Sequence, residues 1–286
     1  MKILLTFLVS FFIFQSYSQN TTFFNFFSKK NLTHKKGDLS IYWGWNGSNY
    51  TNSDIRFQGA NYDFTLNDVV ALDRQSAFDP NIYFNPANMT IPQYNLRIGY
   101  FIHDKYQLSI GADHMKYVMR NYQDVTINGE INVGSGYDGT YSGETINIKP
   151  NFLQFEHTDG LNYENIELRR FDEIIQRKNF TLSMNEGISA GVLIPKTNTT
   201  LLNNDRYDQF HLAGYGLGLV GALNFTFFNH FFIQSELKGG FIHMPDIRTT
   251  QYSSDKASQH FFFAQYNVVF GFRMNILKES SNSNIE

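Results

Sequence analysis

Histidines beside carboxylates are the residues of this 286-residue chain that come closest to a chemical site. His211 and His243 lie near the ends of predicted long connections, and Asp246 follows three residues after His243. A histidine held by a carboxylate can serve as a general base, but catalysis also needs a nucleophile beside it. We therefore keep His211, His243 and Asp246 as weak candidates for a site at a rim, and assign no catalytic residue.

Two further groupings are weaker. Ser109, Asp113 and His114 share one predicted strand, but they do not all face the same side of it, because side chains alternate between the two faces. His157 lies two residues before Asp159, and neither this pair nor the pair of His243 and Asp246 has the spacing of a dedicated metal site. The chain also lacks a Walker motif, a dinucleotide fingerprint and a zinc signature. We predict no metal and no cofactor.

A second set of charged residues occupies one face of segments whose other face is apolar. These residues are Arg97, Asp113, Glu236, Lys238 and Arg273. Inside a closed barrel they would point into the lumen, where unpaired charges are costly, so we expect them to pair across it. The pairing favours a polar plug; the alternative is a narrow path for ions or protons.

The segment 262–276 shows most clearly which elements position these charges. Its even-numbered positions are apolar or aromatic, whereas Gln265, Asn267 and Arg273 lie at odd-numbered positions. The alternation lasts about fifteen residues, and a tilted strand needs about 9–11 to cross a bilayer. The pattern therefore predicts a membrane-spanning strand with one lipid-facing side.

Similar alternation predicts an all-β fold: a transmembrane antiparallel up-and-down β-barrel of eight strands. The uncharged stretch 214–233 would also allow a transmembrane helix, but its period of two and its glycines favour a strand. Ten strands would result if 55–66 added a hairpin arm. The eight expected strands are 39–46, 94–102, 106–119, 161–171, 180–194, 210–227, 231–242 and 262–276.

The expected connections alternate in length. Three are short, at 103–105, 172–179 and 228–230, and four are long, at 47–93, 120–160, 195–209 and 243–260. Outer-membrane barrels have short periplasmic turns and longer extracellular loops. The asymmetry predicts that both ends of the barrel sequence lie on the periplasmic side.

Composition and the first residues agree with an envelope protein. Met1 and Lys2 precede an apolar run over 3–14 and small residues up to Ser18, which is typical of a cleaved signal peptide. The chain has no cysteine, which excludes a lipid-anchored lipoprotein and disulfides, and its net charge of −3 argues against nucleic acid as a partner. We expect a signal peptide at 1–18, a periplasmic segment at 19–37, an outer-membrane barrel at 38–278 and a polar tail at 279–286.

The signal peptide, the alternating connections and the closing Phe270-Gly271-Phe272-Arg273 strand resemble small outer-membrane β-barrel proteins of Gram-negative bacteria, the OmpA-like and lipid A deacylase-like class. The resemblance covers the whole mature chain and implies the barrel fold and an outer-membrane location. A likeness to uncharacterised outer-membrane proteins at 238–240 and 245–248 implies no activity.

The long connections point to function. They are rich in aromatic residues, which suggests folded contact surfaces. The aromatic cluster 23–27 fits a segment that lies at the periplasmic membrane face or docks on a partner, and a linker after the signal peptide is the alternative. We expect a structural or interaction role, in which the protein binds a partner protein or an envelope component through its loops or forms a subunit of an outer-membrane complex. The expected partners are outer-membrane lipid and lipopolysaccharide, and another envelope protein. A lipid-modifying enzyme of lipid A deacylase or acyltransferase type and a small hydrophobic-solute channel remain the alternatives.

Overall fold

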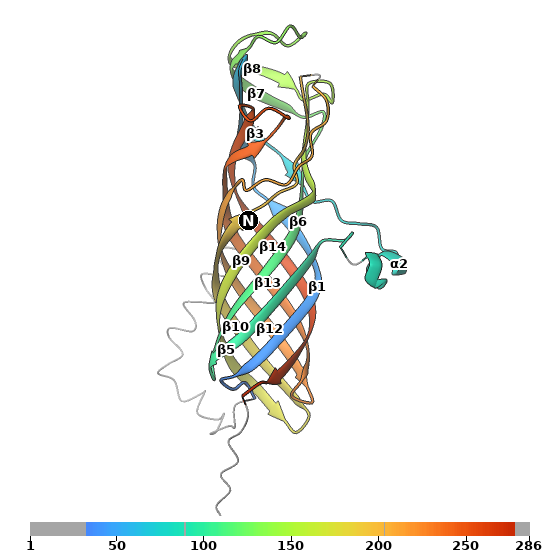
Figure 1. The fold of residues 1–286 in the computed structure, drawn as a ribbon, viewed down its shortest axis with the longest axis vertical. Helices are drawn as coiled ribbons and strands as arrows, with labels where there is room; N and C mark the ends of the chain where they lie inside the picture. The colour runs from blue at the N-terminus through green and yellow to red at the C-terminus, as the bar shows by residue number, and fades with distance from the viewer. Residues whose placement is uncertain (1–32, 89, 203, 278–286) are drawn as a thin grey trace, which may run out of the picture.

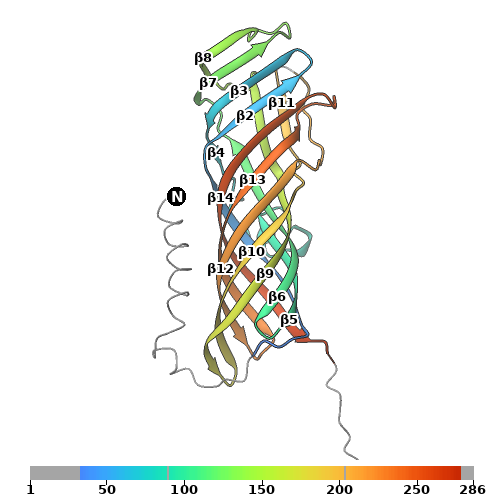
Figure 2. The same cartoon turned by 90° about the vertical axis from the view of Figure 1, so that its left-hand side faces the viewer.

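Eight long strands close into one antiparallel barrel in the computed structural model, which describes residues 33–88, 90–202 and 204–277 (Figures 1 and 2). The order around the ring is β1-β5-β6-β9-β10-β12-β13-β14, and β14 pairs with β1 to close it. The strands are β1 (Asp38–Tyr50), β5 (Tyr94–His103), β6 (Tyr106–Met119), β9 (Leu153–Arg177), β10 (Phe180–Leu193), β12 (Gly214–Phe227), β13 (Phe231–Arg248) and β14 (Lys256–Asn275).

The predicted fold class and strand number are confirmed. Closure runs from the pair Asp38 and Asn275 to the pair Tyr50 and Phe263, so the two ends of the ring meet along their length. The stretch considered for a transmembrane helix forms β12 and the start of β13 instead. In the described part of the chain, no helix is long and apolar enough to cross a membrane. The predicted signal peptide, the cluster 23–27 and the tail 279–286 lie outside the described residues.

The two faces of the barrel wall differ as the alternation predicted. Apolar side chains point outward and stay exposed on every barrel strand, whereas the inward positions carry buried polar and charged residues. An apolar exterior around a polar interior is the arrangement of transmembrane barrels. Outward residues include Ile41, Ile98, Ile110, Ile166, Ile188, Leu219, Leu237 and Val268.

Several predicted boundaries were wrong. β9 is 25 residues long and ends at Arg177, so two residues replace the expected connection at 172–179. β13 continues beyond residue 242, where the prediction ended it, and β14 begins before residue 262, where the prediction began it. Residues 210–213 precede β12, although the prediction included them in that strand. The three short connections still lie at the same end of the barrel as Asp38 and Asn275, which we call the short-turn end (Figure 1).

The long connections fold into further strands at the opposite end. β2 (Ser53–Gly59) pairs with the extension of β14, and β3 (Tyr62–Val69), β7 (Asp124–Ile131) and β8 (Gly139–Asn147) follow in order (Figure 2). The predicted arm at 55–66 therefore exists as the β2–β3 hairpin, but it lies outside the ring, which keeps eight strands. The smaller elements are β4 (Ala71–Leu72), β11 (Asn198–Leu201), α2 (Pro80–Tyr83) and the 3-10 helix η3 (Pro86–Asn88).

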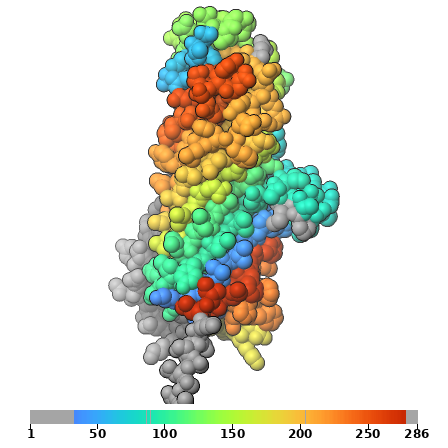
Figure 3. All heavy atoms as spheres, viewed as in Figure 1, coloured from blue at the N-terminus to red at the C-terminus, as the bar shows by residue number. Residues whose placement is uncertain are grey.

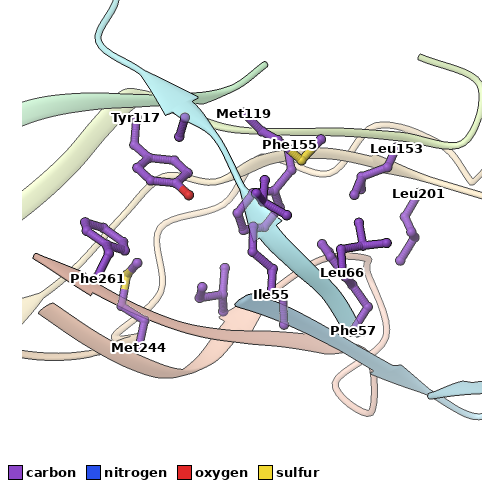
Figure 4. Close-up of a cluster of buried hydrophobic side chains, with 14 of the residues drawn as sticks. Ile55, Phe57, Leu66, Tyr117, Met119, Leu153, Phe155, Leu201, Met244 and Phe261 are labelled. Carbon is purple, nitrogen blue, oxygen red and sulfur yellow. The ribbon is translucent and has the colours of Figure 1, made fainter. Parts of the chain in front are cut away.

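This end has its own hydrophobic core and is called the head. It comprises the described residues of 50–72, 115–163, 193–213 and 242–263. Apolar side chains from the added strands and from the barrel-strand extensions pack into one cluster, in which the rings of Phe57 and Phe64 stack at 5.3 Å and those of Tyr117 and Phe261 at 5.0 Å. Figure 4 shows ten labelled members, which come from seven different strands. Inward positions are thus mainly polar in the barrel, where Tyr42, Phe232 and Val269 form a small apolar cluster, and mainly apolar in the head.

Candidate functional site

The barrel lumen holds a cluster of six charged side chains. Four were expected there from the sequence, and all are almost fully buried. Three are cations and three are carboxylates, so the cluster is neutral as a set. The six residues are Arg97, Arg169, Lys238, Asp113, Glu167 and Glu236.

Ion pairs in this cluster cross the lumen. The Lys238 Nζ, on β13, bonds Asp113 on β6, the strand on the opposite side of the ring, and lies 2.7 Å from a Glu167 oxygen. Arg97 lies 3.0 Å from Glu167 and 3.6 Å from Asp113. Burying such charges is tolerable only when each is paired and hydrogen-bonded, and these contacts meet that condition.

A second group of contacts reaches the wall on the β1 side. Arg169 lies 2.6 Å from Glu167 and 2.7 Å from Glu236. The Tyr42 hydroxyl, from β1, accepts from Arg97 and Arg169, both at 3.1 Å, and donates to Glu236 at 3.1 Å. Side chains from five of the eight strands are therefore joined in one network that fills the middle of the lumen.

Glu167 and Arg169 were missing from the predicted network. They lie on β9, whose charged residues made its alternation look irregular. The alternation was present in the sequence, since Glu167 and Arg169 point inward. Ile166 and Leu168, at the alternate positions, point outward and are exposed. Assigning alternate residues of β9 to opposite faces of the strand would have placed both Glu167 and Arg169 in the lumen.

Arg273 does not join this network. It lies nearer the short-turn end, where its Nε is 3.6 Å from Asp38 and its Nη2 donates to the Asn229 carbonyl at 3.3 Å. The expected network thus divides into a central cluster and a separate pair at the mouth of the barrel.

The residues just before β1 close that mouth. His34 is buried between the rings of Phe101 and Phe171, at 5.0 and 4.8 Å, and its Nδ1 lies 3.5 Å from Glu173. Burial, with the charge of Arg273 nearby, lowers the pKa of His34 to about 4, although Glu173 acts in the opposite direction. A cavity of about 20 Å³ remains beside it, which is room for about one water. The uncharged His34 side chain therefore fills the mouth of the barrel at the short-turn end.

The rim candidates are only partly brought together. His211 Nε2 and an Asp246 oxygen lie 2.9 Å apart in a half-exposed pair. His243 faces His260 across β13 and β14, with ring centroids 6.2 Å apart, and contacts the Tyr215 ring at 5.4 Å. Among the hydrogen bonds of the described residues, none joins His243 to Asp246, and none joins His211 to a side-chain hydroxyl. This arrangement can orient a histidine, but it presents no paired nucleophile.

The remaining groupings are also separated. Ser109 lies in the lumen beside Arg97, at 3.3 Å, whereas His114 bonds Asn162 at 2.8 Å and stacks on Tyr94. His157 is buried in the head, and its Nδ1 lies 2.9 Å from the Thr197 hydroxyl. In the part of the chain that the structure describes, no group of three histidine or carboxylate side chains is arranged so that it could hold a metal ion.

Comparisons with known proteins find likeness in structure alone. No protein-family model and no curated protein matches the chain. The outer membrane protein OprG from Pseudomonas aeruginosa aligns with 86% of this chain and 100% of its own, at 11% identity and a TM-score of 0.41. AlkL, solved in lipid bilayers, aligns with 88% and 96% at 8% identity and 0.38, and Ail of Yersinia pestis with 84% and 99% at 10% and 0.32. The chain is thus similar to small outer-membrane β-barrel proteins, and the likeness extends no further than the fold.

Proposed function

We propose that this is an integral outer-membrane protein whose head is an extracellular binding platform for an anionic component of the envelope. The observation that carries the proposal is the head itself. Its 29 clustered buried apolar residues make the long connections a folded unit, continuous with the barrel strands. A mere closure of the barrel would need far less ordered surface, because short turns suffice at the other end.

The filled lumen supports a binding role over conduction. An eight-stranded barrel has an interior just wide enough for side chains. Here Arg97, Arg169 and Lys238 are among the largest fully buried side chains, and His34 covers the mouth. A solute passing along the axis would have to break several buried ion pairs at once.

The charge pattern of the β13–β14 extension supports an anionic ligand. Arg248 and Lys256 lie directly opposite each other in the strand register, on the side turned away from the head core. Like charges in this position repel each other. Among the described residues neither has an ion-pair partner, so an external anion would relieve the repulsion. Phosphate and carboxylate groups of the lipopolysaccharide headgroup have the required charge.

Binding to lipopolysaccharide tests the proposal. The purified protein in lipid nanodiscs would be titrated with fluorescent lipopolysaccharide at fixed ionic strength. We expect Arg248→Gln with Lys256→Gln to weaken binding about tenfold, equivalent to about 1.4 kcal/mol. The matched control is Arg177→Gln with Lys178→Gln, which removes two exposed cations at the short-turn end.

Two results would count against the proposal. Equal affinity of the wild type and the Arg248→Gln, Lys256→Gln variant would remove the anionic site. Steady single-channel conductance of the wild type in planar bilayers would contradict the plugged barrel and favour the channel alternative.

A further inference from the structure

An aromatic arm projects from the outside of the barrel wall below the head. We define the arm as residues 78–88 with 90–91, which include α2 and η3, and Figure 3 shows this region protruding sideways. Phe78, Phe84 and Ile91 are 73%, 64% and 46% exposed. Aromatic side chains gathered this openly on a folded segment are unusual for a surface that faces only water.

The arm is attached to the lipid-facing side of the barrel. The Trp45 ring, which points outward from β1, contacts Tyr83 at 5.7 Å and Phe84 at 5.6 Å. The same ring contacts Phe270 of β14 at 5.7 Å and Trp43 at 5.0 Å. Phe270 and Trp43 belong to the outward face of the barrel wall. The aromatic surface of the arm is therefore continuous with the apolar exterior of the barrel.

The arm also has a defined conformation. The Asp79 side chain accepts from the Asn81 backbone N–H at 2.8 Å and caps α2, which has proline at its first position. The Tyr83 hydroxyl donates to the Ser76 carbonyl at 2.7 Å, and Lys116 Nζ donates to the Ile91 carbonyl at 2.9 Å. Because the polar groups bond within the arm or to the wall, the exposed rings are held outward instead of collapsing onto the head.

We propose that the arm inserts into the outer leaflet of the membrane, with Phe78 and Phe84 among the lipid chains near the headgroups. Its position fits, since the arm lies beside the barrel wall below the head (Figure 1), and its rings contact the outward-facing Trp45. Aromatic residues concentrate at this level of membrane proteins because their rings are apolar and their polar groups can stay at the interface. The occupant is thus lipid, and the contact extends the lipid-facing surface on one side of the barrel only.

Lipid contact on one side has a consequence for the molecule. The barrel strands fix the height of the wall in the bilayer, and the arm adds an anchor that resists rotation of that side toward water. The head would therefore be held at a fixed orientation above the membrane. This consequence needs the outer-membrane location but holds whether or not the head binds an anion.

Spin labels test the insertion, and the absence of cysteine in the chain makes single-site labelling clean. Phe78→Cys and Phe84→Cys variants would be labelled, placed in phospholipid bilayers, and measured for collisions with oxygen and with a water-soluble nickel complex. Leu219→Cys, on the outward face of β12, is the reference for lipid, and Tyr122→Cys, 68% exposed in the head, is the reference for water.

We expect both arm labels to resemble Leu219→Cys, with oxygen accessibility above nickel accessibility. Nickel accessibility equal to that at Tyr122→Cys would overturn the proposal and place the arm in water. Exclusion of both reagents, or dipolar coupling between labels on two copies, would also overturn it and assign the arm to a protein contact. Since Phe78 is the most exposed of these rings, Phe78→Cys keeps the test valid if Phe84→Cys fails to fold.

Discussion

Neutralising Lys238 should destabilise the barrel through the carboxylates it leaves behind. Its ammonium group bonds Asp113 and lies 2.7 Å from Glu167, in a lumen whose three cations balance three carboxylates. Lys238→Met keeps the length of the side chain but leaves one buried negative charge in excess. Breaking a buried ion pair in this way costs about 3–5 kcal/mol. Asp113→Asn should cost a similar amount, because it leaves one positive charge in excess.

The double variant separates charge balance from lost packing. Lys238→Met with Asp113→Asn restores neutrality, with Arg97 and Arg169 facing Glu167 and Glu236. We expect it to cost no more than one single variant, so the coupling free energy in a double-mutant cycle should be at least the cost of the other single variant, about 3–5 kcal/mol. Urea unfolding from lipid vesicles, followed by tryptophan fluorescence, supplies the four free energies.

A matched cycle on an exposed pair is the control. Arg56 and Asp63 lie 2.6 Å apart in the head, with side chains about half exposed. Exposed pairs contribute about 0–1 kcal/mol, so Arg56→Met with Asp63→Asn should show weak coupling. Additive costs at Lys238 and Asp113, equal in pattern to those of the control, would refute the idea that charge balance holds the lumen together.

Two further predictions concern the wall and the mouth. Leu219→Arg, on the outward face of β12, should lower the free energy of unfolding from vesicles by about 2–4 kcal/mol if that face meets lipid. The control Thr126→Arg, on the exposed face of the head, should lower it by less than about 0.5 kcal/mol. Equal losses would show that the outward face was misassigned. His34 has a folded-state pKa of about 4 against 6.5 in the unfolded chain, so its contribution to stability is complete above pH 6.5 and is lost as pH falls toward 4, by about 3 kcal/mol. His34→Gln should lack this part of the pH dependence in urea titrations at pH 7 and pH 4.5, and an unchanged profile would contradict an uncharged His34 at the mouth.

The barrel could be predicted from the sequence because its signal is repeated. Each membrane strand must keep one apolar face over about ten residues, so alternation persists long enough to read even where one residue departs from it. The same rule placed Arg97, Asp113, Glu236 and Lys238 on inward positions. It missed Glu167 and Arg169 because β9 was not divided into faces.

The head could not be predicted in the same way, because its architecture depends on pairings between distant segments. β2 pairs with β14 at Gln58 and Lys256, almost two hundred residues apart, and no local pattern specifies that contact. The closure of the mouth by His34 was also missed, since an isolated histidine before the first strand has no periodicity. Arg273 lies apart from the central cluster because of its position along the barrel axis. The alternation of apolar and polar residues predicts which face a side chain occupies, but not that position.

The inward face of the strands changes character at one level, and this change explains how one set of strands serves two environments. Along β14 the inward residues Arg273, Asn267 and Gln265, with Gly271 and Val269 between the first two, are followed by Phe263 and Phe261. Other barrel strands change in the same direction, from Asp113 to Met115 on β6, from Asn165 to Tyr163 on β9 and from Ser48 to Tyr50 on β1.

Below this level the outward side chains supply the apolar surface of the barrel, so the inward side chains are free to form a polar network in the lumen. Above it the strands are surrounded by water, and burial of apolar side chains becomes the force that orders the loops. The head is therefore a β-structure with its own apolar core, built on strands that continue from the barrel. The arm leaves the wall near the same level, and the proposed insertion of its outward-turned aromatic segment would place the boundary between lipid and water there.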